Sequence, residues 1–171
     1  MFVGNWGAGS EYNAVGHSRF HPASITVHAL DANGDVAPLK VIRGDKTQLN
    51  WPGAMFYDPA TDELYVANAV GQSILVFRAS DEGDAAPIRV LTGPQTGLSY
   101  PVDLAVDLKN KELWAVNFGN ASATVYPMTA SGDVAPLRTI RSAPRGKRGL
   151  KFGKVSTVAY DSKREELLIP N

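Results

Sequence analysis

The chain repeats itself at an interval of 49 residues, and this repeat constrains its fold more than any other feature. The segment SITVH at residues 24–28 recurs as SILVF at 73–77 and as SATVY at 122–126. The segment GDVAPLKVI at 34–42 recurs at the same two offsets, as GDAAPIRVL and GDVAPLRTI. Several matches at one fixed spacing indicate a repeat architecture, in which every copy folds into the same unit.

A third repeated segment shows where this spacing changes. ELYVAN at 63–68 recurs as ELWAVN at 112–117, but its next copy, ELLIPN at 166–171, lies 54 residues further on. Five residues are therefore inserted between the last two copies, within residues 142–154.

Each repeat contains four short segments rich in β-branched and aromatic residues, which are typical of strands. Turn-forming Gly, Asp, Asn and Pro separate these segments, and no helical period of hydrophobic residues runs through them. In the second repeat the predicted strands lie at 54–57, 64–67, 74–77 and 88–91. Four strands in a repeat of this length predict an all-β fold in which each repeat is one blade of a β-propeller.

The repeat resembles the blades of the NHL-repeat and lactonase-like group of β-propellers. The resemblance lies in PVDLAVD at 101–107, followed by ELWAVN and SATVY, and it covers nearly the whole chain except residues 7–22. It implies that these segments are the three inner strands of a blade and that 135–140 forms the outer one. Because propellers of this group include enzymes, receptors and scaffolds, the resemblance implies a fold and not a chemistry.

The repeats do not form a whole number of blades. With the strands of a blade named a to d from the central axis outward, the chain begins in a b strand and ends in another. We therefore expect 13 strands in about three and a quarter blades, which is an open ring, since propellers typically have four to eight blades. The expected units are strands b, c and d at 1–44 with a long loop at 6–23, complete blades at 53–93 and 102–142, and strands a and b at 155–171.

An open ring has consequences for the partners of this chain. It would expose a blade face at each end and an unpaired strand edge, and such surfaces invite association. We expect the missing blades to come from a longer chain or from another subunit.

Composition and charge narrow the range of partners further. Lys and Arg number 17, as do Asp and Glu, so no net charge attracts nucleic acid or an anionic membrane. Cysteine is absent, which excludes disulfides and thiolate metal sites. No apolar run reaches the roughly 18 residues of a membrane span. We expect no nucleic-acid partner, no membrane span and no cofactor, and the compartment stays unassigned.

Polar residues that recur in every repeat are most simply explained by the blade itself. The Asn that ends each b strand and the Asp that ends each a strand are expected to cap turns, and the Glu that begins each b strand is expected to be a solvated charge. A bound cation would instead need an asymmetric set of carboxylates, so no metal ligand is predicted among them. These residues are Asn5, Asn68, Asn117 and Asn171, Asp58, Asp107 and Asp161, and Glu63, Glu112 and Glu166.

Departures from the repeat are better candidates for a binding site. Alternating strand direction places the b–c and d–a connections on one face of the disc, and the a–b and c–d connections on the other. Aromatic, basic and histidine side chains gather in the irregular b–c and d–a connections, which suits a small ligand or a peptide. The alternative is that Trp51 and Tyr100 only cover the ends of the blades. The predicted ligand-binding residues are Trp6, His17, His21, Arg43, Trp51, Tyr100, Arg145 and Arg148.

Two of these groups have a simpler explanation that stays open. His17 and His21 lack the further ligands and supporting contacts of a metal site, which favours a solvated or packing role. The stretch containing Arg145 and Arg148 holds six basic residues and no acid within 141–154, so it suits an anion or is a solvated insertion.

Three functions remain compatible with the sequence. The first is a non-enzymatic propeller module that binds a partner or ligand on the b–c/d–a face, and no catalytic residue is predicted because no catalytic motif is found. The second is a lactonase- or lyase-like enzyme with a divalent cation in the central well, for which Asp45 and Asp103 are the nearest carboxylates. The third is a purely architectural unit that uses its open ends as an interface.

Overall fold

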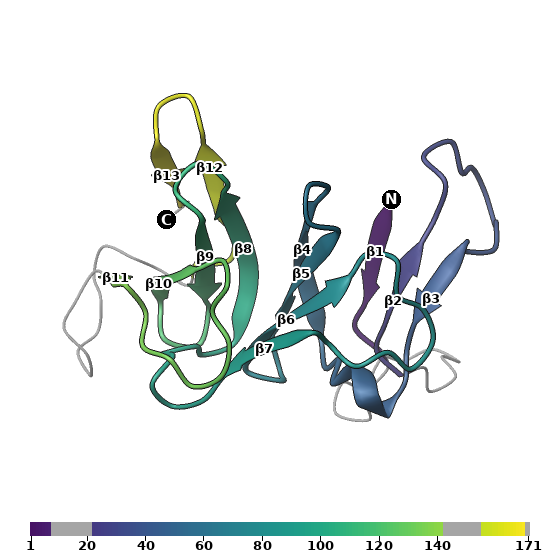
Figure 1. Ribbon diagram of the computed structural model, residues 1–171, viewed down its shortest axis with the longest axis horizontal. Coiled ribbons are helices and arrows are strands. Elements are labelled where there is room, and N and C mark those ends of the chain that lie inside the picture. The colour runs from purple at the N-terminus through teal and green to yellow at the C-terminus, as the bar shows by residue number, and fades with distance from the viewer. Residues whose placement is uncertain (8–21, 142–154, 170–171) are drawn as a thin grey trace.

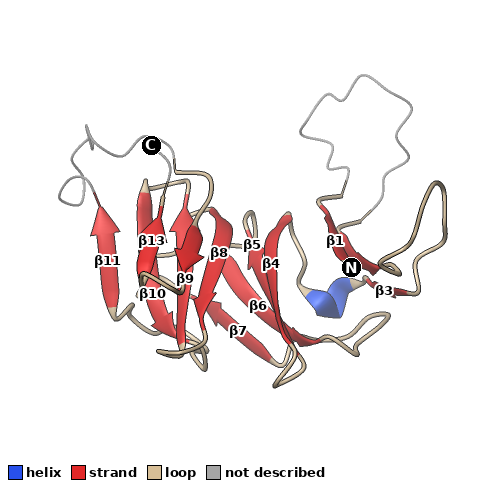
Figure 2. Cartoon of the chain, turned by 90° about the horizontal axis from the view of Figure 1, so that it is seen from above, coloured by secondary structure: helices blue, strands red, loops and turns tan. Residues whose placement is uncertain are grey.

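The computed structural model describes residues 1–7, 22–141 and 155–169, which form thirteen strands in four antiparallel sheets. The all-β, partial propeller fold predicted from the repeat is confirmed. Figure 1 shows the four sheets arranged in sequence order around an open arc, and Figure 2 shows them side by side from above. The sheets are β1 (Phe2–Asn5), β2 (Ser24–Val27) and β3 (Lys40–Ile42); β4 (Pro52–Asp58), β5 (Glu63–Asn68), β6 (Ser73–Arg78) and β7 (Arg89–Thr92); β8 (Pro101–Asp107), β9 (Glu112–Asn117), β10 (Ser122–Pro127) and β11 (Arg138–Arg141); and β12 (Ala159–Asp161) with β13 (Glu166–Leu168).

The alternating direction of side chains along each strand explains why the sheets stack face to face. Successive side chains of a strand point to opposite faces. Leu64 and Val66 of β5 therefore pack with Ile25 and Ile42 of the first sheet, whereas Tyr65 and Ala67 pack with residues of the third sheet. A strand with both faces buried needs hydrophobic residues at every position, and this accounts for the continuous apolar segments of β5, β6, β9 and β10.

The expected turn residues take the roles that the sequence predicts. Asp58 accepts hydrogen bonds from the Ala60 amide and the Thr61 hydroxyl, at 2.9 Å each. Asp107 and Asp161 make the equivalent contacts in the next two a–b turns, where they accept backbone amides at 3.0–3.2 Å. These carboxylates fix the hairpins on the face opposite the predicted site.

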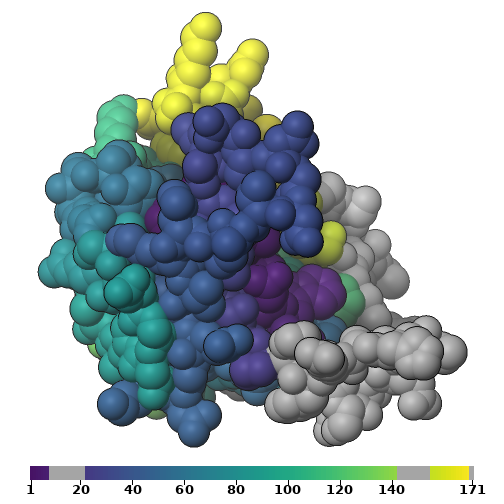
Figure 3. Space-filling model, turned by 90° about the vertical axis from the view of Figure 1, so that its right-hand side faces the viewer, coloured from purple at the N-terminus to yellow at the C-terminus, as the bar shows by residue number. Residues whose placement is uncertain are grey.

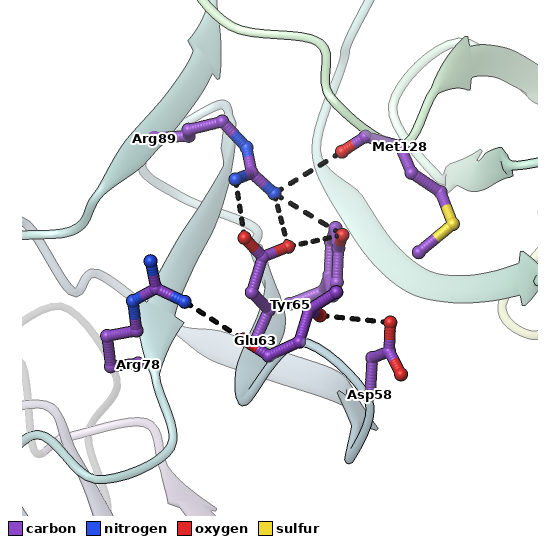
Figure 4. Close-up of polar contacts among 7 residues, drawn as sticks. Asp58, Glu63, Tyr65, Arg78, Arg89 and Met128 are labelled. Atoms are coloured by element: carbon purple, nitrogen blue, oxygen red, sulfur yellow. Dashed lines mark hydrogen bonds and ion pairs between the residues drawn. The ribbon is translucent and has the colours of Figure 1, made fainter.

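Two of the three recurring glutamates, Glu63 and Glu112, correct one expectation, whereas Glu166 is exposed as expected. Glu63 is not a solvated charge: both its oxygens accept hydrogen bonds from Arg89 at 2.7 Å, and one accepts the Tyr65 hydroxyl at 2.8 Å. Figure 4 shows the pair, with Arg89 also donating to the Met128 carbonyl of the third sheet. Arg89 holds the pKa of Glu63 below its ordinary value, against the opposing effect of burial. Glu112 is paired in the same way, with Arg138.

The c–d connections correct a second expectation. They are expected on the face opposite the d–a connections, but two of them extend to the d–a connection of the preceding sheet. The connection between β6 and β7 reaches across to the first sheet, where Gly83 forms a parallel bridge with Ile42 and Asp84 contacts the d–a connection at Lys46. That d–a connection contains a single turn of 3-10 helix, η1 (Asp45–Thr47), which the strand pattern did not predict. No helix in the described segments has the length and hydrophobicity needed to cross a membrane.

Candidate functional site on the b–c/d–a face

Four aromatic rings form a row across the first three sheets on the b–c/d–a face. The Trp6 ring stacks on Trp51 with centroids 4.8 Å apart and planes inclined by 22°. Trp51 meets Tyr100 edge-on at 6.0 Å, and Tyr100 contacts Phe118 at 6.1 Å. Such spacings lie within the range of favourable aromatic pairs. Three predicted site residues, Trp6, Trp51 and Tyr100, are therefore brought together.

The row is built from two positions of the repeat. Trp51 and Tyr100 stand directly before the inner strands β4 and β8, and Trp6 and Phe118 stand directly after the b strands β1 and β9. The backbone joins these positions, since the Phe118 amide donates to the Tyr100 carbonyl at 3.1 Å. The rings remain partly exposed, with Trp6 the most open at 57%.

Both residues before the inner strands have an unusual backbone. Trp51 has φ of 59° and Tyr100 has φ of 52°, in the left-handed region that glycine adopts without strain. An aromatic residue held there costs on the order of 1–3 kcal/mol, so the surrounding contacts must impose this conformation. The neighbouring amides show how: Asn50 donates to Asn68 at 2.6 Å, and Ser99 donates to Asn117 at 3.1 Å.

The recurring asparagines fix the backbone that carries the aromatic row. Asn68 and Asn117 are fully buried, and each side-chain amide also donates to the hydroxyl that begins the next strand, Ser73 at 2.9 Å and Ser122 at 3.3 Å. Their amide groups are thus occupied by the connections of their own blade. The capping role predicted for these two residues is confirmed, and Asn171 lies outside the described residues.

A buried tyrosine supports the next connection of the same face. The Tyr126 hydroxyl donates to the Thr96 carbonyl at 2.7 Å, within the d–a connection that leads to Tyr100. Burial raises the pKa of Tyr126 to about 12, so this hydroxyl remains a donor well above neutral pH.

Of the other predicted residues, Arg43 is the one within the described segments. Arg43 lies at the end of β3, the outermost strand of the first sheet; its side chain is exposed, and its amide donates to Gly83 at 2.8 Å. His17, His21, Arg145 and Arg148 lie outside the described residues. Phe118 was missed because its equivalent in the second repeat is Ala69, so the repeat gave no aromatic signal there. Its alignment with Trp6 is the feature that could have identified it.

Asp103 and Asp45, the two carboxylates considered as ligands for a cation, have different surroundings. Asp103 accepts the Thr157 hydroxyl at 2.6 Å and the Val158 amide at 2.7 Å on one oxygen, and the Leu104 amide at 2.8 Å on the other. It therefore links the third and fourth sheets. Asp45 is exposed in η1. Among the described residues, no three histidine, aspartate or glutamate side chains form a group that could hold a metal ion.

Comparison with known proteins places the chain at the level of the fold. No protein-family model matches it, and no curated protein does. Its structure is similar to that of the periplasmic gluconolactonase PpgL of Pseudomonas aeruginosa, with a TM-score of 0.60 and 18% sequence identity. The match covers 98% of this chain and 46% of that one, so the chain spans about half the length of that protein. Likeness at this identity shows the fold alone, and the chain has the fold of a partial β-propeller.

Proposed function

We propose that this chain is part of a non-enzymatic β-propeller that binds a small ligand or a peptide on its b–c/d–a face, at the row formed by Trp6, Trp51, Tyr100 and Phe118. The observation that carries the proposal is the left-handed backbone of Trp51 and Tyr100. Glycine would hold the same backbone without strain. The backbone at these positions therefore does not itself require two large rings.

The chemistry of the row favours a ligand with a flat or apolar face. Partly exposed Trp and Tyr rings offer a large contact area and lose little conformational entropy on binding. Sugar rings and the side chains of extended peptides present suitable surfaces. The basic and histidine residues predicted on the same face, Arg43, Arg145, Arg148, His17 and His21, would add attraction for anionic groups.

The test replaces one ring by the residue that its backbone prefers. Trp51→Gly removes the centre of the row and relieves the strain at this position, so the variant is expected to fold. Lys111→Gly is the matched control, because Lys111 has φ of 57° in an a–b turn on the opposite face. Binding is measured by calorimetry against a panel of oligosaccharides and short peptides.

The two variants are expected to behave differently. Any ligand bound by the natural chain should lose about tenfold or more in affinity with Trp51→Gly, and keep its affinity with Lys111→Gly. Unchanged affinity in both Trp51→Gly and Trp6→Ala would remove the proposed site and favour the simpler role of covering the ends of the blades.

The second candidate is a lactonase-like enzyme that uses a divalent cation. It is favoured by the structural neighbour, which is named a gluconolactonase. Asp103 would have to release its contacts with Thr157 and Val158 before it could bind a cation through that oxygen. Gluconolactone hydrolysis measured with added calcium or zinc and with chelator separates the candidates, since a cation-dependent rate that Asp103→Asn abolishes would support the enzyme.

A further inference from the structure

Gln72, in the b–c connection of the second sheet, bonds the connection that carries one ring of the aromatic row. Its side-chain oxygen accepts the Tyr100 amide at 2.9 Å, from a residue 28 positions further along the chain. Its side-chain nitrogen donates to the Ala69 carbonyl at 3.3 Å, within its own connection. The side chain therefore joins the second sheet to the residue that stands before the inner strand of the third.

These contacts belong to a series of hydrogen bonds that follows the aromatic row. The Ala69 amide donates to the Trp51 carbonyl at 3.0 Å, and the Phe118 amide donates to the Tyr100 carbonyl at 3.1 Å. Gln72 connects these two backbone bonds, since it contacts Ala69 on one side and Tyr100 on the other. Three residues of the row are thus linked to one another through one glutamine side chain.

Gln72 is also a departure from the repeat. The equivalent residues are Ala23 and Ala121, whose methyl groups neither donate nor accept a hydrogen bond. Gln72 and Ala121 share the same left-handed backbone, with φ of 51° and 50°. The b–c turn therefore forms with either residue, and the turn does not itself require glutamine. What distinguishes Gln72 from its equivalents is the bond to Tyr100.

The bond reaches Tyr100 where its backbone is strained. Tyr100 has φ of 52°, and a residue other than glycine keeps this conformation only when the surrounding contacts impose it. The preceding amide, of Ser99, is held by Asn117 of the third sheet, so side chains of two different sheets fix two successive amides. Figure 1 shows that this contact lies between the two complete sheets, away from the end of the molecule that the first sheet covers in Figure 3.

We propose that Gln72 is a positioning residue of the ligand site. It holds the Tyr100 backbone in the left-handed conformation and so keeps the Tyr100 ring edge-on to Trp51 before a ligand arrives. This inference rests on the function proposed above. A ring that is already fixed in its binding position loses less conformational entropy when a ligand binds. Ligand affinity should therefore depend on Gln72 through Tyr100, without a contact between Gln72 and the ligand.

Two variants of similar side-chain length test this role without a ligand. Gln72→Met removes the oxygen that accepts the Tyr100 amide, and Gln72→Glu keeps one. Both should fold, because the side chain of Gln72 is exposed and Ala121 forms the same turn. Amide hydrogen exchange followed by NMR should become about tenfold faster at Tyr100 in Gln72→Met and stay unchanged at Ser99. Gln72→Glu should restore most of the protection at Tyr100.

Calorimetry then tests the consequence for binding, with any oligosaccharide or peptide of the panel that the natural chain binds. Gln72→Met should weaken binding about threefold to tenfold, Gln72→Glu should recover most of the affinity, and Gln72→Met should have no further effect in a Tyr100→Gly background. Unchanged exchange at Tyr100 in Gln72→Met, or a loss of affinity that persists in the Tyr100→Gly background, would overturn the proposal. If no compound binds, the proposed function fails, whereas the exchange measurement still decides whether Gln72 positions Tyr100.

Discussion

The second and third sheets carry the same Glu–Arg pair in two different environments. Glu63 and Arg89 are joined by two bonds of 2.7 Å, and Glu112 and Arg138 by bonds of 2.9 and 2.5 Å. Each arginine also lies over the aromatic ring of its b strand, at 5.8 Å from Tyr65 and 5.4 Å from Trp114. The Arg89 side chain is nevertheless 20% exposed, and that of Arg138 is 53% exposed.

The difference arises from the neighbouring sheet and not from the repeat. Arg89 is covered by the third sheet, where it reaches the Met128 carbonyl (Figure 4). The described fourth sheet contains only β12 and β13, and Arg138 remains open. Identical repeat positions therefore differ in their energetic importance, because an ion pair gains strength when a neighbouring sheet excludes water from it.

The largest expected effect separates these two pairs. Arg89→Met leaves the Glu63 carboxylate mostly buried without its cation, which should lower the free energy of unfolding by about 3 kcal/mol. Arg138→Met breaks an exposed pair and should cost about 1 kcal/mol or less. Urea denaturation of both variants measures the difference, and equal losses would show that the third sheet does not strengthen the Glu63–Arg89 pair.

A smaller effect is expected where the two sheets differ by one hydroxyl. Phe77 and Tyr126 occupy the same position and both are fully buried, but only Tyr126 donates to a d–a connection, at the Thr96 carbonyl. Tyr126→Phe leaves that carbonyl without this donor and should cost about 1–2 kcal/mol. Thermal unfolding measures it, and the reciprocal Phe77→Tyr is the control.

The Phe77→Tyr control tests whether a hydroxyl at this position matters in the second sheet as well as in the third. In Phe77→Tyr the added hydroxyl would point toward the equivalent residue of the preceding connection, Thr47, and should change stability by less than about 1 kcal/mol. A Tyr126→Phe variant as stable as the natural chain would mean that the hydroxyl does not hold the connection before Tyr100.

The smallest expected effect concerns the a–b turns of the two sheets. Asp62 and Lys111 have φ of 56° and 57°, but the Asp62 carboxylate also accepts the Ser80 hydroxyl at 2.9 Å. Lys111→Gly relieves the backbone and should stabilise the fold by about 0.5 kcal/mol, whereas Asp62→Gly loses a bond as well and should be close to neutral. Differential scanning calorimetry resolves the two, and a destabilised Lys111→Gly would contradict the strain argument.

Much of the fold could be predicted because the repeat and the strand period are both local features of the sequence. The thirteen strands and the turn roles of Asp58 and Asn68 follow from spacing and residue type. The pairing of Glu63 with Arg89 could not be predicted, since the two are 26 residues apart and lie on β5 and β7, which are separated by β6 in the folded sheet. The contact of Gly83 with the first sheet could not be predicted for a similar reason, because its partner Ile42 belongs to another repeat.

The candidate site, too, could be predicted only in part from the sequence. Trp6, Trp51 and Tyr100 could be selected as aromatic residues in irregular connections, but their spacing along the chain does not place their rings in contact. Phe118 completes the row only because sheets at successive positions of the arc bring equivalent connections side by side.

By itself the sequence determined the blade: its four strands, its turns and the identity of its repeated side chains are set by short-range pattern and backbone preference. The tertiary structure alone decided which of these equivalent residues are buried, which rings stack and which c–d connections bind the preceding sheet. The physical reason is that burial and pairing depend on which side chains the adjacent sheet contributes. The sequence of one repeat does not specify those side chains.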